Sequence, residues 1–288
     1  MEEKAVIRIG CPVWTCPQWR GEVYAAKSTR KQWLRDYSHA FNSVEGNSTF
    51  YGIPKTDTFK RWGSETADEF RFALKFPRAV SHELELVGAE RETAAFMDGL
   101  AILHEAERLG PSFLQLGPRF GPSQFAVLRN YLNNLPQQFP YAVEVRHPDF
   151  FKEPFETELN EMLREMGVDR LIFDSRPLFS APATDEIEEA AQTRKPRVPV
   201  KPHVTGCNPI LRLIGRNDVS QVQPWIDEWA DTILHWLDSG KSPFVFAHAP
   251  DDRFAPALAR LLADKLNAVT GQRIETEEPA GKTQQMLF

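Results

Sequence analysis

The sequence predicts an α/β protein that folds as a single (β/α)8 (TIM) barrel. Eight segments with strand patterns alternate with helical patterns over roughly 270 residues, which is the element count and the size of that fold. A doubly wound open sheet is the competing architecture, and it usually carries a glycine-rich phosphate loop after its first strand. Here the first strand is followed by Gly10-Cys11-Pro12-Val13-Trp14, which is not such a loop. The barrel is therefore the expected fold.

The composition narrows the class of protein. The chain has 288 residues, of which 42% are hydrophobic, and this is enough for a substantial core. The net charge of −6 argues against general adhesion to DNA or to anionic membranes. The three cysteines form no C-x-x-C pair, so neither a disulfide framework nor a zinc knuckle is expected. Because the amino terminus is charged and no apolar run approaches the roughly 18 residues of a membrane span, we expect a cytoplasmic protein without membrane contact.

Strands are predicted from β-branched and alternating apolar runs, and helices from apolar residues at helical spacing. Ser123 is expected to cap the helix that it begins. The expected strands are 5–10, the segment around Glu45, 70–76, 112–116, 141–147, 170–174, 210–215 and 243–248. The expected helices are 30–41, 56–67, 90–108, 123–135, 156–166, 222–238 and 254–269.

One domain is expected over residues 1–272, with an excursion from the repeat at residues 176–209. The excursion lies between the sixth and seventh strands and combines a short acidic helix with a proline-spaced stretch, which favours an extended path. Residues 273–288 are polar and lack periodicity, so we expect a flexible C-terminal tail.

The stretch from Ser43 to Tyr51 combines a strand pattern with a polar turn and an aromatic pair. Successive side chains of a strand alternate between its two faces, so Glu45 and Asn47 share one face. A carboxylate and an amide on a buried strand cost free energy unless a partner or a ligand uses them. This stretch therefore indicates a functional site at the end of the second strand.

Polar side chains also stand near the carboxyl ends of most other expected strands, where barrel active sites lie. Alternation turns them away from the apolar residues that pack on helices. Several charged groups in one cleft are typical of a functional site. The expected catalytic residues are Glu45, Lys75, Glu144 and Asp174. The expected ligand-binding residues are Trp14, Asn47, Tyr51, Gln115, Arg146, His147, Arg212 and His248.

The expected ligand is a small anion or the phosphate of a nucleic acid. Lys75, Arg146 and Arg212 bring cations to one place in a protein that is acidic overall, and guanidinium groups present planar forks that suit phosphate or carboxylate. Neither an H-x-x-x-H nor an H-x-H pair occurs, so no cofactor and no tightly bound metal is expected. A divalent ion held weakly with a phosphate ligand is the alternative.

Several motifs of the sequence occur together in a recognisable order. They are Trp19-x-Gly21-x-x-Tyr24, Phe41-Asn42-x-Val44-Glu45-x-Asn47-Ser48-Thr49-Phe50-Tyr51, Phe72-Ala73-x-Lys75-x-Pro77, Gln115-Leu116-x-Pro118-x-Phe120, Glu144-x-Arg146-His147-Pro148 and Arg212-x-x-Gly215. In this order they resemble the YecE-like family, domain of unknown function 72. The resemblance implies a (β/α)8 barrel without an established activity. Gly46, Phe150, Ile214 and the pair Ala247-His248 depart from the residues usual in that family.

Three functions are compatible with these residues. The first is hydrolysis of a phosphate ester or phosphodiester, with arginines holding the anion, Glu45 or Glu144 as general base and Lys75 or His248 as acid. The second is an anion-binding or nucleic-acid-binding module without turnover. The third is a carbohydrate-active enzyme that uses Glu45 and Glu144 as paired carboxylates, although neighbouring cations lower carboxyl pKa values.

The end of the chain carries a separate motif. Gln284, Leu287 and Phe288 resemble the short peptide with which bacterial repair and replication proteins bind the sliding clamp. Such a peptide inserts its Leu-Phe pair into an apolar pocket as a small hot spot on a flexible tether. This resemblance predicts the sliding clamp as a partner and a link to DNA metabolism, and packing of the tail on its own domain is the alternative.

Overall fold

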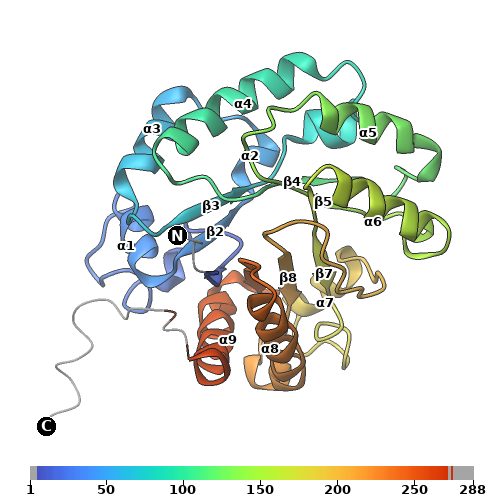
Figure 1. The fold of residues 1–288 in the computed structure, drawn as a ribbon. Helices are drawn as coiled ribbons and strands as arrows, with labels where there is room; N and C mark the ends of the chain where they lie inside the picture. The colour runs from blue at the N-terminus through green and yellow to red at the C-terminus, as the bar shows by residue number, and fades with distance from the viewer. Residues whose placement is uncertain (1–4, 272–273, 275–288) are drawn as a thin grey trace, which may run out of the picture.

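The protein has an α/β fold built from parallel strands, with the long helices outside them (Figure 1). The computed structural model describes residues 5–271 and residue 274. The strands are β1 (Arg8–Gly10), β2 (Ser43–Gly46), β3 (Arg71–Leu74), β4 (Ser112–Gln115), β5 (Tyr141–Glu144), β6 (Asp169–Arg170), β7 (Ile172–Asp174), β8 (Ile210–Ile214) and β9 (Phe244–His248). The α-helices are α1 (Trp33–Ala40), α2 (Ser48–Tyr51), α3 (Thr56–Glu65), α4 (Glu90–Glu105), α5 (Phe125–Asn133), α6 (Phe155–Glu165), α7 (Glu186–Arg194), α8 (Gln223–Asp238) and α9 (Ala255–Thr270). Shorter turns are η1 (Pro17–Trp19), the π-helical η2 (Ala79–Glu83), η3 (Pro122–Gln124), η4 (Pro148–Phe151), η5 (Val219–Val222) and η6 (Asp252–Phe254).

The predicted strands and helices are present, and their ends differ from the prediction by a few residues. The predicted strand 170–174 is divided into β6 and β7, which are separated at Leu171. The expected cap at Ser123 is wrong, because Ser123 lies inside η3 and α5 begins two residues later. Pro122, whose fixed φ suits the first position of a helix, starts the turn before Ser123.

The strands form three hydrogen-bonded sheets, in the orders β1-β9-β8-β7, β2-β3 and β4-β5-β6. All of the strand pairs are parallel. The register places Gln115 beside Glu144 and Ile214 beside His248. The polar residues Gln115 and Glu144 are therefore level with each other at the carboxyl ends of their strands.

Apolar side chains pack on both faces of the strands, as is usual for parallel sheets. The larger core lies between the strands and the helices and includes Phe72 and Leu74 of β3. A smaller core includes Ala73, Phe113 and Phe173. Because side chains alternate along β3, this second core lies on the opposite face, which we call the inner face. Within the described residues, no helix is long and apolar enough to cross a membrane.

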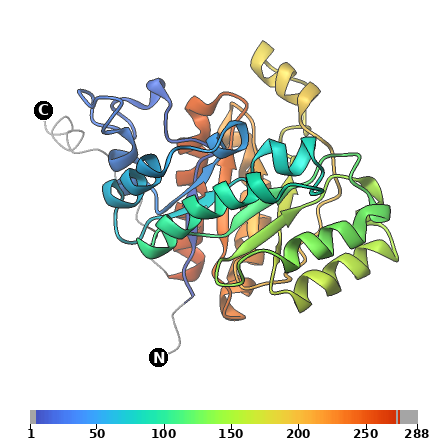
Figure 2. The same ribbon diagram turned by 90° about the horizontal axis from the view of Figure 1, so that it is seen from above.

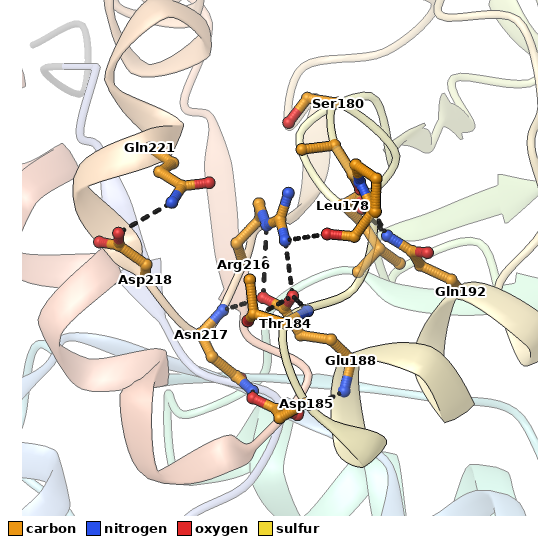
Figure 3. Close-up of polar contacts among 12 residues, drawn as sticks. Leu178, Ser180, Thr184, Asp185, Glu188, Gln192, Arg216, Asn217, Asp218 and Gln221 are labelled. Atoms are coloured by element: carbon orange, nitrogen blue, oxygen red, sulfur yellow. Dashed lines mark hydrogen bonds and ion pairs between the residues drawn. The ribbon is translucent and has the colours of Figure 1, made fainter.

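The excursion at 176–209 carries α7, which projects from one end of the fold (Figure 2). Asp185 caps α7 by accepting hydrogen bonds from the backbone N–H groups of Ile187 and Glu188, at 2.9 and 2.8 Å. Glu188 in turn forms a buried ion pair with Arg216, which follows β8, with Oε2 accepting from Nη2 at 2.7 Å (Figure 3). The backbone N–H of Asn217 donates to the other oxygen of Glu188 at 2.9 Å. These contacts fix the excursion to the end of β8.

Ile274 lies in the segment that was expected to be a flexible tail. Its side chain is buried, and its backbone N–H donates to Asn267 Oδ1 at 2.6 Å. The rest of segment 273–288 lies outside the described residues.

Candidate functional site

Arg212 of β8 joins two carboxylates on the inner face. Its Nε and Nη2 donate to Oε2 and Oε1 of Glu45, both at 2.8 Å, and its Nη1 donates to Oε2 of Glu144 at 2.6 Å. All three side chains are buried. The guanidinium carbon of Arg212 lies 5.6 Å from the ring centre of Phe113 and 5.5 Å from that of Phe173, where the electron-rich ring faces attract a cation. Each of the three nitrogens of Arg212 thus donates to a carboxylate within the protein.

Two further side chains complete the surroundings of Glu45. Asn47 Nδ2 donates to Oε1 at 2.6 Å, and His248 Nε2 lies 3.0 Å from Oε2. Burial opposes ionisation of Glu45, but Arg212 and His248 outweigh it and hold the pKa of this carboxyl well below its usual range. Burial lowers the pKa of His248 to about 4, against the attraction of Glu45. Because an ionised carboxylate only accepts hydrogen bonds, the neutral imidazole carries its proton on Nε2 and donates it to Glu45.

Gln115 of β4 links Glu144 to a lysine. Its Nε2 donates to Glu144 Oε1 at 2.8 Å, and its Oε1 accepts from Lys75 Nζ at 2.8 Å. Arg146 Nε donates to the same oxygen of Glu144 at 2.7 Å. Burial raises the pKa of Glu144, but Arg146, Arg212 and Lys75 together lower it to about 2. Glu144 is therefore an ionised acceptor at neutral pH.

Lys75 is the group of this network whose protonation changes near neutral pH. Burial lowers its pKa to about 7, and repulsion from Arg212 adds to this effect, against the attraction of Glu144 and Glu45. Its Nζ lies 3.9 Å from the ring centre of Phe50, in the geometry of a cation–π contact. Among the described residues the ammonium group has one hydrogen-bond acceptor, Gln115, so two of its three donors remain for a ligand.

Among the described cations around Glu45 and Glu144, Arg146 has the most unused donors. Its side chain is 22% exposed, and its guanidinium carbon lies 5.4 Å from the ring centre of Phe173. Only its Nε is bonded within the described part of the chain, where Nη1 and Nη2 have no acceptor. Two parallel N–H groups of this kind match two oxygens of a phosphate or carboxylate.

Two residues near this network were not predicted from the sequence. Lys195 follows α7 in the excursion; burial lowers its pKa to about 8, and it interacts electrostatically with Arg212, Glu45 and Arg146. Ser175 Oγ, at the end of β7, donates to the carbonyl oxygen of Pro196 at 2.9 Å and so holds the chain next to Lys195. No signal in the sequence could have predicted that Lys195 lies at the site. The spacing of the prolines predicts an extended path for this segment but does not predict where that path runs.

The second unpredicted residue is His82 of η2. Its ring centre lies 5.1 Å from that of Phe50, edge to face. Burial and the charges of Lys75, Arg146 and Arg78 lower its pKa to about 4, so the imidazole is neutral at pH 7. The histidine could have been noticed in the sequence, because it follows the third strand by a few residues.

The expectation that Asp174 shares this site is wrong. Its carboxylate accepts hydrogen bonds from Arg176, with Nη2 at 2.8 Å, and from Trp229 Nε1 of α8, also at 2.8 Å. Phe173 occupies the inner face, and alternation turns the next residue toward the helices. Asp174 was expected at the site because it ends a strand, and alternation with Leu171 and Phe173, which both lie on the inner face, places it on the helix side.

Trp14, Tyr51 and His147 also lie outside the hydrogen-bonded network. The ring of Trp14 packs edge-on against Trp62, at 5.1 Å between ring centres, on the helix side of the strands. Tyr51 is 81% exposed. His147 Nδ1 accepts from the backbone N–H of Asp149 at 3.2 Å. Ligand binding by these three residues stays a prediction, and so does binding of a sliding clamp by Gln284, Leu287 and Phe288, which lie outside the described residues.

The arrangement combines four cations with two carboxylates. Within the described residues, no group of three or more His, Cys, Asp or Glu side chains is placed to hold a metal ion. Four cations (Lys75, Arg146, Lys195 and Arg212) lie around the two carboxylates Glu45 and Glu144, and the half-buried Asp252 interacts with Lys195 at the edge of the group. The N–H donors that have no acceptor among the described residues belong to cations, namely Lys75 and Arg146.

Comparisons with known proteins place the chain in a family. Residues 8–283 match the family model described as "Protein of unknown function DUF72". The chain is 38% identical over 262 residues to UPF0759 protein YecE of Escherichia coli K12, which covers 91% of this chain and 93% of that protein.

Solved structures of the same family share the fold. A DUF72 family protein from Thermotoga maritima MSB8 superposes with a TM-score of 0.70 at 20% identity, covering 93% of this chain and 100% of that chain. A DUF72 family protein from Enterococcus faecalis V583 superposes with a TM-score of 0.66 at 21% identity, covering 93% of this chain and 98% of that chain. The resemblance predicted from the motifs is confirmed, and the chain belongs to the DUF72 family.

Proposed function

We infer that the three sheets are parts of one closed (β/α)8 barrel. Backbone hydrogen bonds bridge the breaks between them. Glu45 N donates to Cys11 O just after β1 at 3.1 Å, Phe76 N just after β3 donates to Phe113 O of β4 at 3.0 Å, and Leu171 N between β6 and β7 donates to Val143 O of β5 at 2.9 Å. In such a barrel the carboxyl ends of all strands meet at one mouth.

At that mouth we propose a site for a phosphate-bearing ligand. The observation that carries the proposal is Arg146, whose Nη1 and Nη2 have no acceptor in the described part of the chain and which is linked to the Lys75 ammonium group through Glu144 and Gln115. Arg212 is not the main anion-binding group of this proposal, because it is buried and each of its three nitrogens already donates to Glu45 or Glu144. Its role in the proposal is to hold the two carboxylates ionised and in place.

The chemistry we propose is hydrolysis of a phosphate ester. Water attacks phosphorus, the bond from phosphorus to the ester oxygen breaks, and the Lys75 ammonium group gives its proton to the leaving oxygen. A proton released by the attacking water returns Lys75 to its charged form, so an alcohol and inorganic phosphate are the products. A pKa of about 7 suits Lys75 to this exchange, because proton transfer is most efficient when the catalytic pKa lies near the working pH. Arg146 offsets the charge on the phosphate.

The carbohydrate alternative is not favoured by the geometry. A glycosidase acid needs a carboxyl group that keeps its proton near neutral pH. Cations lower the pKa values of both Glu45 and Glu144, and one arginine bridges the two groups. Neither carboxyl is therefore suited to the role of acid.

Two assays on the full chain test the proposal. Calorimetric titration with inorganic phosphate, sulfate and glucose should show binding of the two anions alone. Incubation with p-nitrophenyl phosphate should release nitrophenolate from the wild type and not from a Lys75→Met variant. Binding without release would leave the anion-binding module as the function, and absence of anion binding would overturn the proposal.

A further inference from the structure

A cavity of about 410 Å³ opens beside the proposed phosphate site. It lies between α2 and η2, and part of its wall is apolar, formed by Phe50, Tyr51, Ile53 and Pro77. Its volume is that of a site for a small molecule. The cavity is not used by the proposed hydrolysis, because none of the residues that line it belongs to the hydrogen-bonded network of Glu45 and Glu144.

One aromatic ring connects the cavity to the phosphate site. Phe50 lines the cavity, and the ammonium group of Lys75 lies 3.9 Å from the centre of its ring. Pro77, which also lines the cavity, follows Lys75 by two residues. Phe50 is therefore a wall that the cavity shares with the Lys75 end of the phosphate site.

The cavity offers a ring that a ligand can stack on. Tyr51 is 81% exposed at the cavity wall, and its ring meets that of Phe50 edge to face with 5.2 Å between centres. The ring of Phe50 already contacts the Lys75 ammonium group. Among the described aromatic residues of the cavity wall, Tyr51 therefore offers the exposed ring for a ligand to stack on. Nucleobases stack on such aromatic rings whatever the identity of the base, because every base has a π-face.

The charges in the cavity set the orientation of such a ligand. Glu83 and Glu92 line it, and the one cation that the described residues place in its wall, Arg78, is already paired with Glu83 at 3.3 Å. These carboxylates repel a phosphate and accept hydrogen bonds from N–H groups of a heterocycle. The phosphate is therefore directed to Arg146 and Lys75, and the ring to the cavity.

We propose that this cavity holds a nucleobase whose phosphate lies at Arg146 and Lys75, so that the ligand of the protein is a nucleotide. The proposal rests on the proposed function for the position of the phosphate. It adds the class of ligand, since the cavity selects a planar ring among phosphate-bearing compounds.

The test compares four probes with the full-length protein by calorimetric titration: inorganic phosphate, ribose 5-phosphate, adenosine and adenosine 5′-monophosphate. The wild type should bind the nucleotide about tenfold more tightly than ribose 5-phosphate, the fold-change expected for stacking of one base. Tyr51→Ala should abolish this difference and leave the affinity for inorganic phosphate unchanged, whereas Tyr51→Phe should retain it. Val87→Ala, which alters another exposed apolar residue outside the cavity wall, is the matched control.

The outcomes separate this inference from the proposed function. Equal affinities for the nucleotide and ribose 5-phosphate in the wild type would overturn the nucleobase site and leave the phosphate site standing. Adenosine binding that depends on Tyr51, without any phosphate binding, would support the nucleobase site and overturn the proposed function. A short single-stranded oligonucleotide that binds more tightly than the mononucleotide, again through Tyr51, would support the site and identify a nucleic-acid end as the source of the base.

Discussion

Arg212 and Glu45 form a buried bidentate ion pair between β8 and β2, two strands that belong to different hydrogen-bonded sheets. The third N–H group of the same guanidinium reaches Glu144, on a strand of the remaining sheet. A single side chain therefore joins all three sheets at their carboxyl ends. Because burying charges costs free energy unless all of them are paired, each member of this trio depends on the others.

Replacement of Arg212 by methionine should lower the free energy of unfolding by about 3–5 kcal/mol, because Glu45 and Glu144 would stay buried without their common partner. In the wild type the low carboxyl pKa values contribute stability that is present above about pH 4.5 and is lost as the pH falls toward about 2. In the variant the buried carboxyls should take up protons at higher pH than in the wild type, so the difference in stability between the two proteins should shrink as the pH is lowered.

Urea denaturation at several pH values measures this effect. Arg129→Met, which breaks an exposed ion pair with Glu165, is the control and should cost no more than about 1 kcal/mol. An Arg212→Met protein as stable as the control variant would show that the trio does not hold the sheets together.

Substitution of His248 by glutamine should flatten the pH dependence of stability. The pKa of His248 is lowered to about 4 in the folded protein, so its contribution is present above about pH 6.5 and is lost as the pH falls toward 4. The loss in the wild type is on the order of 3 kcal/mol. Glutamine keeps a donor for Glu45 but does not titrate. Thermal unfolding at several values between about pH 4 and pH 6.5 should therefore show a weaker pH dependence of stability in the variant than in the wild type. A variant with the wild-type slope would contradict the assignment of a neutral, buried imidazole.

Sulfate should bind more weakly as the pH rises through about 7, because the Lys75 ammonium group loses its proton there. Sulfate remains a dianion over this range, so the change belongs to the protein. Loss of one hydrogen bond to a charged group corresponds to an affinity about tenfold lower. Calorimetry near pH 6 and pH 8 should show the decrease in the wild type, and Lys75→Arg, which stays charged, should show a smaller decrease, because only Lys195, with a pKa of about 8, then titrates among the site cations of the described residues. A pH-independent wild type would remove Lys75 from the site.

Loss of the Glu188 carboxylate should release the excursion from the end of β8. Glu188→Ala leaves Arg216 buried without its partner, at a cost of about 3–5 kcal/mol. Backbone amides of α7 should then exchange with deuterium faster than in the wild type. Asp218→Ala removes contacts to Ser220 and Gln221 at the exposed side of the same region (Figure 3) and should leave the exchange of α7 unchanged. Unchanged exchange in Glu188→Ala would show that other contacts hold α7.

The sequence predicted most of the hydrogen-bonded network, because alternation along a strand is a strict consequence of backbone geometry. It placed Glu45, Lys75, Glu144 and Arg212 on one side of their strands, and the structure brings them together. Asp174 was assigned from its position at a strand end alone, and alternation with Phe173 on the inner face places its side chain on the other side.

Other features had no local signal in the sequence. Lys195 reaches the site through a long segment without periodicity, and its position depends on the remote pair of Glu188 and Arg216. Trp14 was expected at the site because it follows the first strand, but packing against Trp62 of α3 places it among the helices. Long-range contacts of this kind are set by tertiary packing, which a single sequence does not display.

Calorimetric titration of Arg146→Ala with inorganic phosphate tests the proposed phosphate site most directly. The side chain is partly exposed and, among the described residues, is hydrogen-bonded only through Nε to Glu144, so the variant should fold. Its binding free energy for phosphate should weaken by about 1.5–3 kcal/mol, the range for a hydrogen bond to a charged group. Arg129→Ala on α5, outside the site, should bind phosphate as the wild type does. Equal affinity in the wild type and in Arg146→Ala would contradict the proposal that the strand ends form a phosphate site.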